Sequence, residues 1–188
     1  MKYSLYDIYP EGITNGYGKV FANQRFRILK RLPKFNSILD VGSGPCYLKE
    51  WLTNNFSESI NYEAVDIRPE TLALCDCVKY TTIPTNKLYD VVCLFGTVTY
   101  NIDYDENKNK QILKELLEQS KHITKQIVFT VFKDSTKERV PLKRKNNFVY
   151  FSIDEIKNLL QELELKLITV EHCYDPDEYF VICEINNA

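Results

Sequence analysis

The chain has 188 residues, of which 44% are hydrophobic and 27% charged, and its formal net charge is −2. These values are ordinary for a soluble globular domain and argue against a disordered chain. No apolar run approaches the length of a membrane span, and Lys2 is followed by no apolar core of a secretory signal. We therefore expect one domain over residues 1–188, located in the cytoplasm.

Helical and strand-like patterns alternate along the chain from about residue 17. The N-terminal helix is expected to end at Pro33, and Pro45 suits the first turn of the second helix. The predicted order is helix 17–32, strand 37–41, helix 45–52, strand 62–66, strand 89–95, helix 106–123, strand 126–132 and helix 152–163.

The C-terminal third combines a helix start with a hairpin. Ser152 and Glu155 are spaced as a capping box, and the β-rich runs 166–174 and 178–185 are joined by the turn residues 175–177. Alternating strands and helices predict an α/β fold, a mostly parallel sheet with helices on both faces. The hairpin should add one antiparallel strand at or near its edge.

The stretch 67–84 allows two interpretations. Either 70–76 is a short helix followed by a strand near 78–82, or 72–75 is itself the strand. A parallel crossover normally needs a dozen or more residues, which favours the first interpretation.

The six cysteines are predicted to be reduced and free of metal. Only Cys75 and Cys77 are close in sequence, and no second pair or nearby histidine completes a tetrahedral zinc site. Cys93 and Cys183 lie in apolar runs, where cysteine acts as a small hydrophobic residue. The remaining two cysteines are Cys46 and Cys173.

Positive charge is concentrated in the stretches 1–36 and 133–147. Such runs are usually solvated surface. If the two stretches meet in space, an anionic acceptor becomes the better explanation.

The first predicted strand runs directly into Gly42-Ser43-Gly44, and Asp66 ends the next strand, 24 residues after Gly42. In an open parallel sheet, ligands bind beyond the carboxyl ends of the strands, where glycines let the backbone approach closely. A carboxylate there can accept hydrogen bonds from both hydroxyls of a ribose. A dinucleotide site would need a third glycine at position 47, which is Tyr47.

Three segments together resemble the class I S-adenosylmethionine-dependent methyltransferases. They are Ile38 to Pro45 (ILDVGSGP), Val65-Asp66-Ile67, and Tyr89 to Val92 (YDVV). The resemblance covers most of the chain. It implies S-adenosylmethionine as the cofactor and a Rossmann-like, three-layer fold with a seven-stranded sheet of order 3-2-1-4-5-7-6, strand 7 being antiparallel.

The resemblance also implies roles for single residues. Asp40 would orient the ammonium group of the cofactor, Asp66 would hold the ribose, and Ile67 would pack on the adenine. Asp76 is the candidate for an acid that the family often places after strand 3. The full set of implied cofactor residues is Asp40, Gly42, Ser43, Gly44, Asp66, Ile67, Asp76, Phe95, Gly96 and Thr97.

Two points depart from this pattern. Cys46 stands where the family usually has the third glycine of its turn. Asp40 and Asp66 could also serve only to cap neighbouring helices.

Methyl transfer from a sulfonium mainly requires alignment of the nucleophile, and a base only when a proton must leave early. Tyr100 and Asp103 are the catalytic candidates because they follow the strand 89–95. His122, His172 and Tyr174 are weaker candidates, and a structural role explains both histidines.

The acceptor is expected to be a small or medium-sized molecule. The sequence after the strand 89–95 lacks the Asn/Asp-Pro-Pro-Tyr motif of amino-directed DNA methyltransferases, and Pro45-Cys46 lies in the cofactor turn. We expect a helical cap over 1–36 and a lid over 133–150. These would present Arg25, Arg139 or Arg144 to an anionic acceptor. The alternatives are an RNA or protein methyltransferase and a non-catalytic module that binds the cofactor.

Overall fold

The computed structural model describes residues 22–56, 59–68, 72–99, 104–138, 148–172 and 177–185. Its strands are β1 (Ser37–Val41), β2 (Asn61–Val65), β3 (Val78–Tyr80), β4 (Tyr89–Leu94), β5 (Thr124–Lys133), β6 (Tyr150–Phe151), β7 (Leu165–His172) and β8 (Glu178–Ile185). Its helices are a helical turn over 22–26 that continues into η1 (Arg27–Arg31), then α3 (Tyr47–Asn55), α5 (Glu106–Lys121), η2 (Asp134–Glu138) and α6 (Ile153–Glu162).

The strands form one mixed sheet of order β3-β2-β1-β4-β5-β8-β7. The pairs from β3 to β5 are parallel, whereas β8 is antiparallel to both β5 and β7. This confirms the predicted sheet, with β7 and β8 as the family's sixth and seventh strands. The sequence did not predict β6, a two-residue strand that pairs with β5 off the main path.

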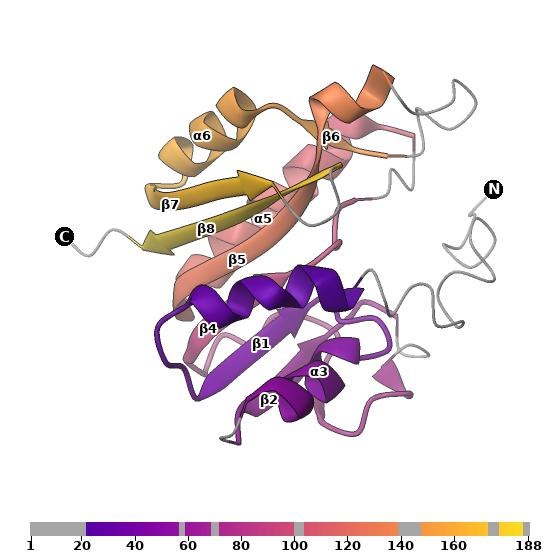
Figure 1. Cartoon of the computed structure of the whole chain (residues 1–188), viewed down its shortest axis with the longest axis vertical. Helices are drawn as coiled ribbons and strands as arrows, with labels where there is room; N and C mark the ends of the chain where they lie inside the picture. Colours follow the sequence, from indigo (N-terminus) through magenta and orange to yellow (C-terminus); the bar gives the residue numbers. More distant parts are fainter. Residues whose placement is uncertain are drawn as a thin grey trace.

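Helices cover both faces of the sheet, as Figure 1 shows. Leu113 and Leu117 of α5, with Ile156 and Leu160 of α6, are buried against one face. The helical segment 22–31 and α3 pack on the other face in a second core. Burial of both faces explains why the central strands contain runs of consecutive apolar residues, such as Val91 to Leu94 of β4.

Cap residues fix the starts of two helices, α5 and α6. Ser152 and Glu155 make the predicted capping box at α6, each side chain bonding to the other residue's backbone N–H. Asp105 caps α5 by accepting a hydrogen bond from the Lys108 backbone N–H at 3.0 Å. These bonds satisfy backbone donors that the helix leaves without partners.

The stretch 67–84 follows the first of its two interpretations, a short helix and then a strand. The backbone makes a short helical turn near Leu72, and β3 begins at Val78 and pairs in parallel with β2. The strand ends at Tyr80, two residues earlier than expected.

In the ranges given above, no helix is both long enough and apolar enough to cross a membrane.

Candidate functional site

The order of the strands reverses between β1 and β4. In an open α/β sheet the ligand crevice lies beyond the carboxyl ends of the strands at such a point, and this place is the candidate crevice. Thr97, just after β4, donates its hydroxyl to the Val41 carbonyl at 2.6 Å, which joins the ends of β4 and β1. A Cβ on Gly42 would lie 2.7 Å from the Thr97 side chain. Glycine is therefore required at position 42 for β1 and β4 to meet here.

The turn 42–46 is also bound to the end of β2. The backbone N–H groups of Gly42 and Ser43 both donate to the Val65 carbonyl, at 2.7 and 3.1 Å. Gly42, Gly44 and Cys46 have φ values of 76°, 52° and 58°, in the left-handed region that favours glycine. Cys46 is thus the strained member of a turn whose other two left-handed positions are glycines.

Asp66 lies directly after β2 and is 4% exposed. Its Oδ2 accepts a hydrogen bond from the Gly44 backbone N–H at 3.0 Å. Its Oδ1 accepts from the backbone N–H and the Nε of Arg68, at 3.0 and 3.2 Å. Asp66 therefore binds the glycine turn itself, and both of its oxygens have partners within the chain.

Asp40, on β1, is buried next to this turn and accepts a hydrogen bond from the Tyr62 hydroxyl at 2.7 Å. Burial raises the pKa of Asp40 to about 7, the Tyr62 hydrogen bond opposes this, and the charge of Asp66 adds to it. The crevice thus contains two nearby carboxyl groups, one of which changes charge near neutral pH.

Three features of the turn fit a ligand. The Ser43 hydroxyl is buried and has no hydrogen-bond partner within the described part of the chain. A Cβ on Gly44 would meet no atom within 4 Å, so the space beside it is open. Ile67, next to Asp66, is 80% exposed although it is a large apolar residue. A buried polar group without a partner calls for an explanation, and a bound molecule supplies one.

Asp76 is not where the resemblance needs it. It precedes β3, and the residues that follow β3, from Thr81 to Asn86, include no acid. Its carboxylate is fully exposed, and the side chain of Lys49 on α3 donates to its backbone carbonyl. The prediction failed because the strand begins after Asp76, which the sequence pattern left open.

The prediction that all cysteines are reduced is wrong for one pair. Cys46 and Cys75 form a disulfide, with their Cα atoms 5.7 Å apart. Sequence spacing could not show this, because the two residues are 29 positions apart and meet only through the fold. Cys93 and Cys183 are free and fully buried, which confirms their role as small hydrophobic residues.

The end of β4 forms the other wall of the crevice. The Gly96 backbone N–H donates to Thr130 Oγ1 of β5 at 2.9 Å, and the Phe95 ring lies 5.5 Å from that of Phe26. A Cβ on Gly96 would lie 3.1 Å from an Nη of Arg25. The N-terminal helical segment therefore lies next to the residues at the end of β4.

Arg25 is paired within the protein. Its guanidinium binds both carboxylate oxygens of Glu178, Nε at 2.6 Å, and Glu178 is completely buried at the start of β8. Sequence reasoning missed Glu178, whose only signal is an acid at the head of the apolar run 179–183. An acid in this position neutralises the arginine that was predicted to bind an anion.

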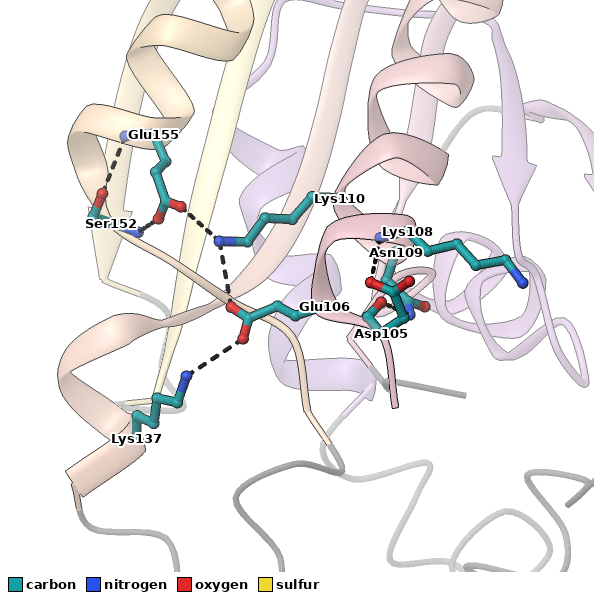
Figure 2. Close-up of polar contacts among 8 residues, drawn as sticks. All are labelled: Asp105, Glu106, Lys108, Asn109, Lys110, Lys137, Ser152 and Glu155. Atoms are coloured by element: carbon teal, nitrogen blue, oxygen red, sulfur yellow. Dashed lines mark hydrogen bonds and ion pairs between the residues drawn. The ribbon is translucent and has the colours of Figure 1, made fainter. Parts of the chain in front are cut away.

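The element that follows β5 is also held by charged contacts. Lys137 of η2 lies 3.3 Å from Glu106 of α5, and Glu106 also contacts Lys110. Lys110 in turn reaches Glu155 of the α6 capping box at 2.6 Å. Figure 2 shows this chain of contacts running from η2 across α5 to Ser152. Charged contacts therefore link the elements that follow β4, β5 and β6, namely α5, η2 and α6.

Five predicted residues lie outside the described residues: Tyr100, Asp103, Arg139, Arg144 and Tyr174. His122 is an exposed C-cap of α5, 3.4 Å from Glu118, and the His172 ring lies 5.7 Å from that of Tyr179. A hollow of about 820 Å³ opens where α5 and α6 end and β7 begins, and no predicted site residue lines it apart from His122, the weaker base candidate.

Comparison with known proteins supports the fold. No protein-family model matches the chain, and no curated protein matches it. A methyltransferase of Clostridium acetobutylicum that depends on S-adenosylmethionine has 14% identity and a TM-score of 0.63, with 96% of each chain covered. Magnesium protoporphyrin IX methyltransferase of Synechocystis PCC 6803, with bound S-adenosylhomocysteine, has 10% identity and a TM-score of 0.67 over 99% of this chain and 90% of that one.

A third match comes from a complex between the Trm112 methyltransferase activator of Haloferax volcanii and a candidate methyltransferase. It has 13% identity and a TM-score of 0.73 over 97% of this chain and 98% of that one. At such identities the likeness establishes the fold, which is that of the class I S-adenosylmethionine-dependent methyltransferases.

Proposed function

We propose that the chain binds S-adenosylmethionine in the crevice and transfers its methyl group to a small or medium-sized acceptor. Anionic acceptors belong to this proposed class. The observation that carries the proposal is the buried carboxylate of Asp66, bonded to the Gly44 N–H where the strand order reverses. An acid after the second strand, facing a glycine turn, is the arrangement that recognises an adenosine ribose.

Residues in the turn 42–46 and next to it fit the remaining parts of the ligand. The Ser43 hydroxyl is a buried donor and acceptor with no partner among the described residues, and it suits the amino acid end of the cofactor. Asp40 would complement the ammonium group, directly or through water. Ile67 offers exposed apolar surface to the adenine. Gly44 leaves the space that this ligand needs.

When bound, the sulfonium supplies an already activated methyl group. The residues at the end of β4, which are Phe95, Gly96 and Thr97, would line the path of transfer and exclude water. Their part is to align the acceptor with the methyl carbon, since alignment supplies most of the catalysis in such a displacement. Tyr100 and Asp103 stay our candidates for contact with the acceptor, because they follow this wall in sequence.

The acceptor class is inferred from charge and position. Arg25 is bound to Glu178, so Arg139 and Arg144 are the residues we propose for an anionic group. Basic residues in the described parts of both stretches contact other residues: Arg31 pairs with Glu171, and Lys137 with Glu106. These pairs reduce the positive surface that an RNA acceptor would need, and favour a small acceptor.

The cofactor proposal is tested by isothermal titration with S-adenosylhomocysteine. Asp66→Ala should weaken binding about 10- to 100-fold, since a lost charge-assisted pair of hydrogen bonds costs about 1–3 kcal/mol. Asp76→Ala should bind like the wild type, because its carboxylate points into solvent. Equal affinity of a folded Asp66→Ala variant and the wild type would remove the ribose role.

Turnover is a separate question from binding. Incubation with S-adenosylmethionine and a panel of carboxylate, phosphate, phenol and amine metabolites should give S-adenosylhomocysteine with at least one acceptor. If the protein binds the cofactor and methylates no member of the panel and no added RNA or protein, the non-catalytic binding module becomes the better explanation.

A further inference from the structure

The Cys46–Cys75 disulfide lies in the wall of the candidate cofactor crevice. Cys46 ends the turn 42–46 and is the N-cap of α3, and Cys75 lies between β2 and β3. The bond therefore ties the turn after β1 to the segment that follows Asp66. Such a cross-link restricts the conformations of everything it encloses, here a stretch that includes α3 and β2.

The disulfide acts on the turn at two points. Gly44 lies between Asp66 and the disulfide: its N–H donates to Asp66 Oδ2 at 3.0 Å, and its carbonyl oxygen is 3.5 Å from Cys75 Sγ. Cys46 itself has a φ of 58°. A non-glycine residue in this region is disfavoured by about 1–2 kcal/mol, so it stays there only while its surroundings hold it.

A third thiol and an opening accompany the bond. The sulfur atoms of Cys46, Cys75 and Cys77 all lie within 4.8 Å of one another, and Cys77 is free. Burial raises the pKa of the Cys77 thiol, so it is mostly protonated at neutral pH and attacks the disulfide slowly. A hollow of about 300 Å³, lined by Cys46, Cys75 and Lys49 among others, leads from the surface to the bond.

We propose that Cys46 and Cys75 form a reversible redox site that controls the shape of the cofactor turn. A dithiol reductant opens the bond: its two sulfurs become a disulfide, and Cys46 and Cys75 each take up one proton and become thiols. The oxidised protein holds the turn in the shape that binds an adenosyl ligand, and the reduced protein binds it more weakly. The statement on affinity rests on the proposed function, whereas the statement on the turn does not.

The test compares oxidised wild-type protein with the same protein reduced by dithiothreitol. S-adenosylhomocysteine is the probe, titrated by calorimetry, and reduction should weaken its affinity about fivefold or more, the lower end of typical coupling between sites. Cys75→Ser should bind like the reduced protein with or without reductant. Cys77→Ser is the matched control and should keep the full difference between the two states. Mass spectrometry of unreduced peptides should show Cys46 linked to Cys75.

Coupling is reciprocal, so the ligand should also make the disulfide harder to reduce by the same factor. Equal affinity of the oxidised and reduced proteins would overturn the proposal, as would a peptide that links Cys46 to Cys77 in the wild type.

If S-adenosylhomocysteine binds neither form, the proposed function fails and the redox site is judged without ligand. The amides of Gly42, Ser43, Gly44 and Cys46 are all hydrogen-bonded in this structure. Their hydrogen exchange should be faster after reduction. Equal exchange rates in the two states would overturn the proposal.

Discussion

Two arginine–carboxylate pairs stand at the two walls of the crevice, and they differ in how firmly they are held. Arg68 and Asp66 are two residues apart, and the arginine side chain is 26% exposed. Arg25 and Glu178 are 153 residues apart, and the carboxylate is completely buried. The first pair is local, and we expect a ligand to displace it, whereas the second fastens the N-terminal helical segment to β8.

The two walls also differ in the contacts that their charged and polar groups make. At the β2 end, the carboxylate of Asp66 faces an open turn in which the Ser43 hydroxyl has no described partner. At the β4 and β5 ends, the charges are used within the protein: Arg25 on Glu178, Lys137 on Glu106, and the buried Lys133 over the ring of Tyr179. We therefore expect the first wall to contact a ligand and the second mainly to hold the fold together.

The largest effect is expected from breaking the buried pair. Arg25→Ala leaves the Glu178 carboxylate buried without its strongest partner, which should lower the free energy of unfolding by about 3 kcal/mol. Arg31→Ala is the matched control, since its pair with Glu171 is exposed and should contribute about 1 kcal/mol or less. Urea unfolding followed by circular dichroism measures both.

Replacing both partners separates the pair from the packing around it. Arg25→Met combined with Glu178→Leu removes both charges and should recover most of the loss, because no buried charge is left. If Arg25→Ala is no more damaging than Arg31→Ala, the pair does not fasten the helical segment, and the contrast between the walls is wrong.

A smaller effect is expected from the pH dependence of Asp40. Its folded pKa is about 7, against an ordinary value of 3.8, so between these pH values the native state holds a proton that the unfolded chain has released. This contribution to stability is complete below pH 3.8 and is lost as the pH rises through 7, at about 1 kcal/mol per pH unit or less. Asp40→Asn should therefore gain stability relative to the wild type between pH 5 and 8.

Asp90 provides the control of opposite sign. Hydrogen bonds from the Asn36 and Ser37 backbone hold its pKa below the ordinary value, so its contribution is present at neutral pH and is lost in acid. Asp90→Asn should be less stable than the wild type at neutral pH, and the difference in stability between the two proteins should shrink as the pH falls. Parallel stability curves for wild type and Asp40→Asn would contradict the raised pKa of Asp40.

The sequence predicted the wall at β2 better than the wall at β4. Gly42, Gly44 and Asp66 are recognisable because a strand, a turn and a strand-end acid act within short stretches of chain. The sheet order came from the family resemblance that these stretches carry. The partner of Arg25 was not predictable, because it depends on the N-terminal helix and β8 meeting in space. The same reason hid the disulfide, whose two cysteines meet only when β2 and α3 are in place.

Two local ambiguities account for the remaining errors. The position of β3 could not be fixed because the apolar residues of 67–84 allow a strand either at 72–75 or near 78–82, and Asp76 was misplaced with it. The strand β6 has only two residues and carries no periodic pattern of its own.

The smallest effect concerns the displaceable pair. Arg68 Nε and Nη2 lie 3.2 and 3.5 Å from the Asp66 oxygens that a ribose would use, so the guanidinium competes with the ligand. Arg68→Ala removes this competitor but keeps the backbone N–H that bonds to Asp66 Oδ1. The affinity for S-adenosylhomocysteine should rise about threefold, because a larger share of the protein is ready to bind. Arg68→Lys keeps a charge without the planar donors, so its affinity should lie between those of the wild type and Arg68→Ala. A loss of affinity in Arg68→Ala would mean that the arginine contacts the ligand. The two arginine–carboxylate pairs would then differ in sequence separation and burial, but a ligand would displace neither of them.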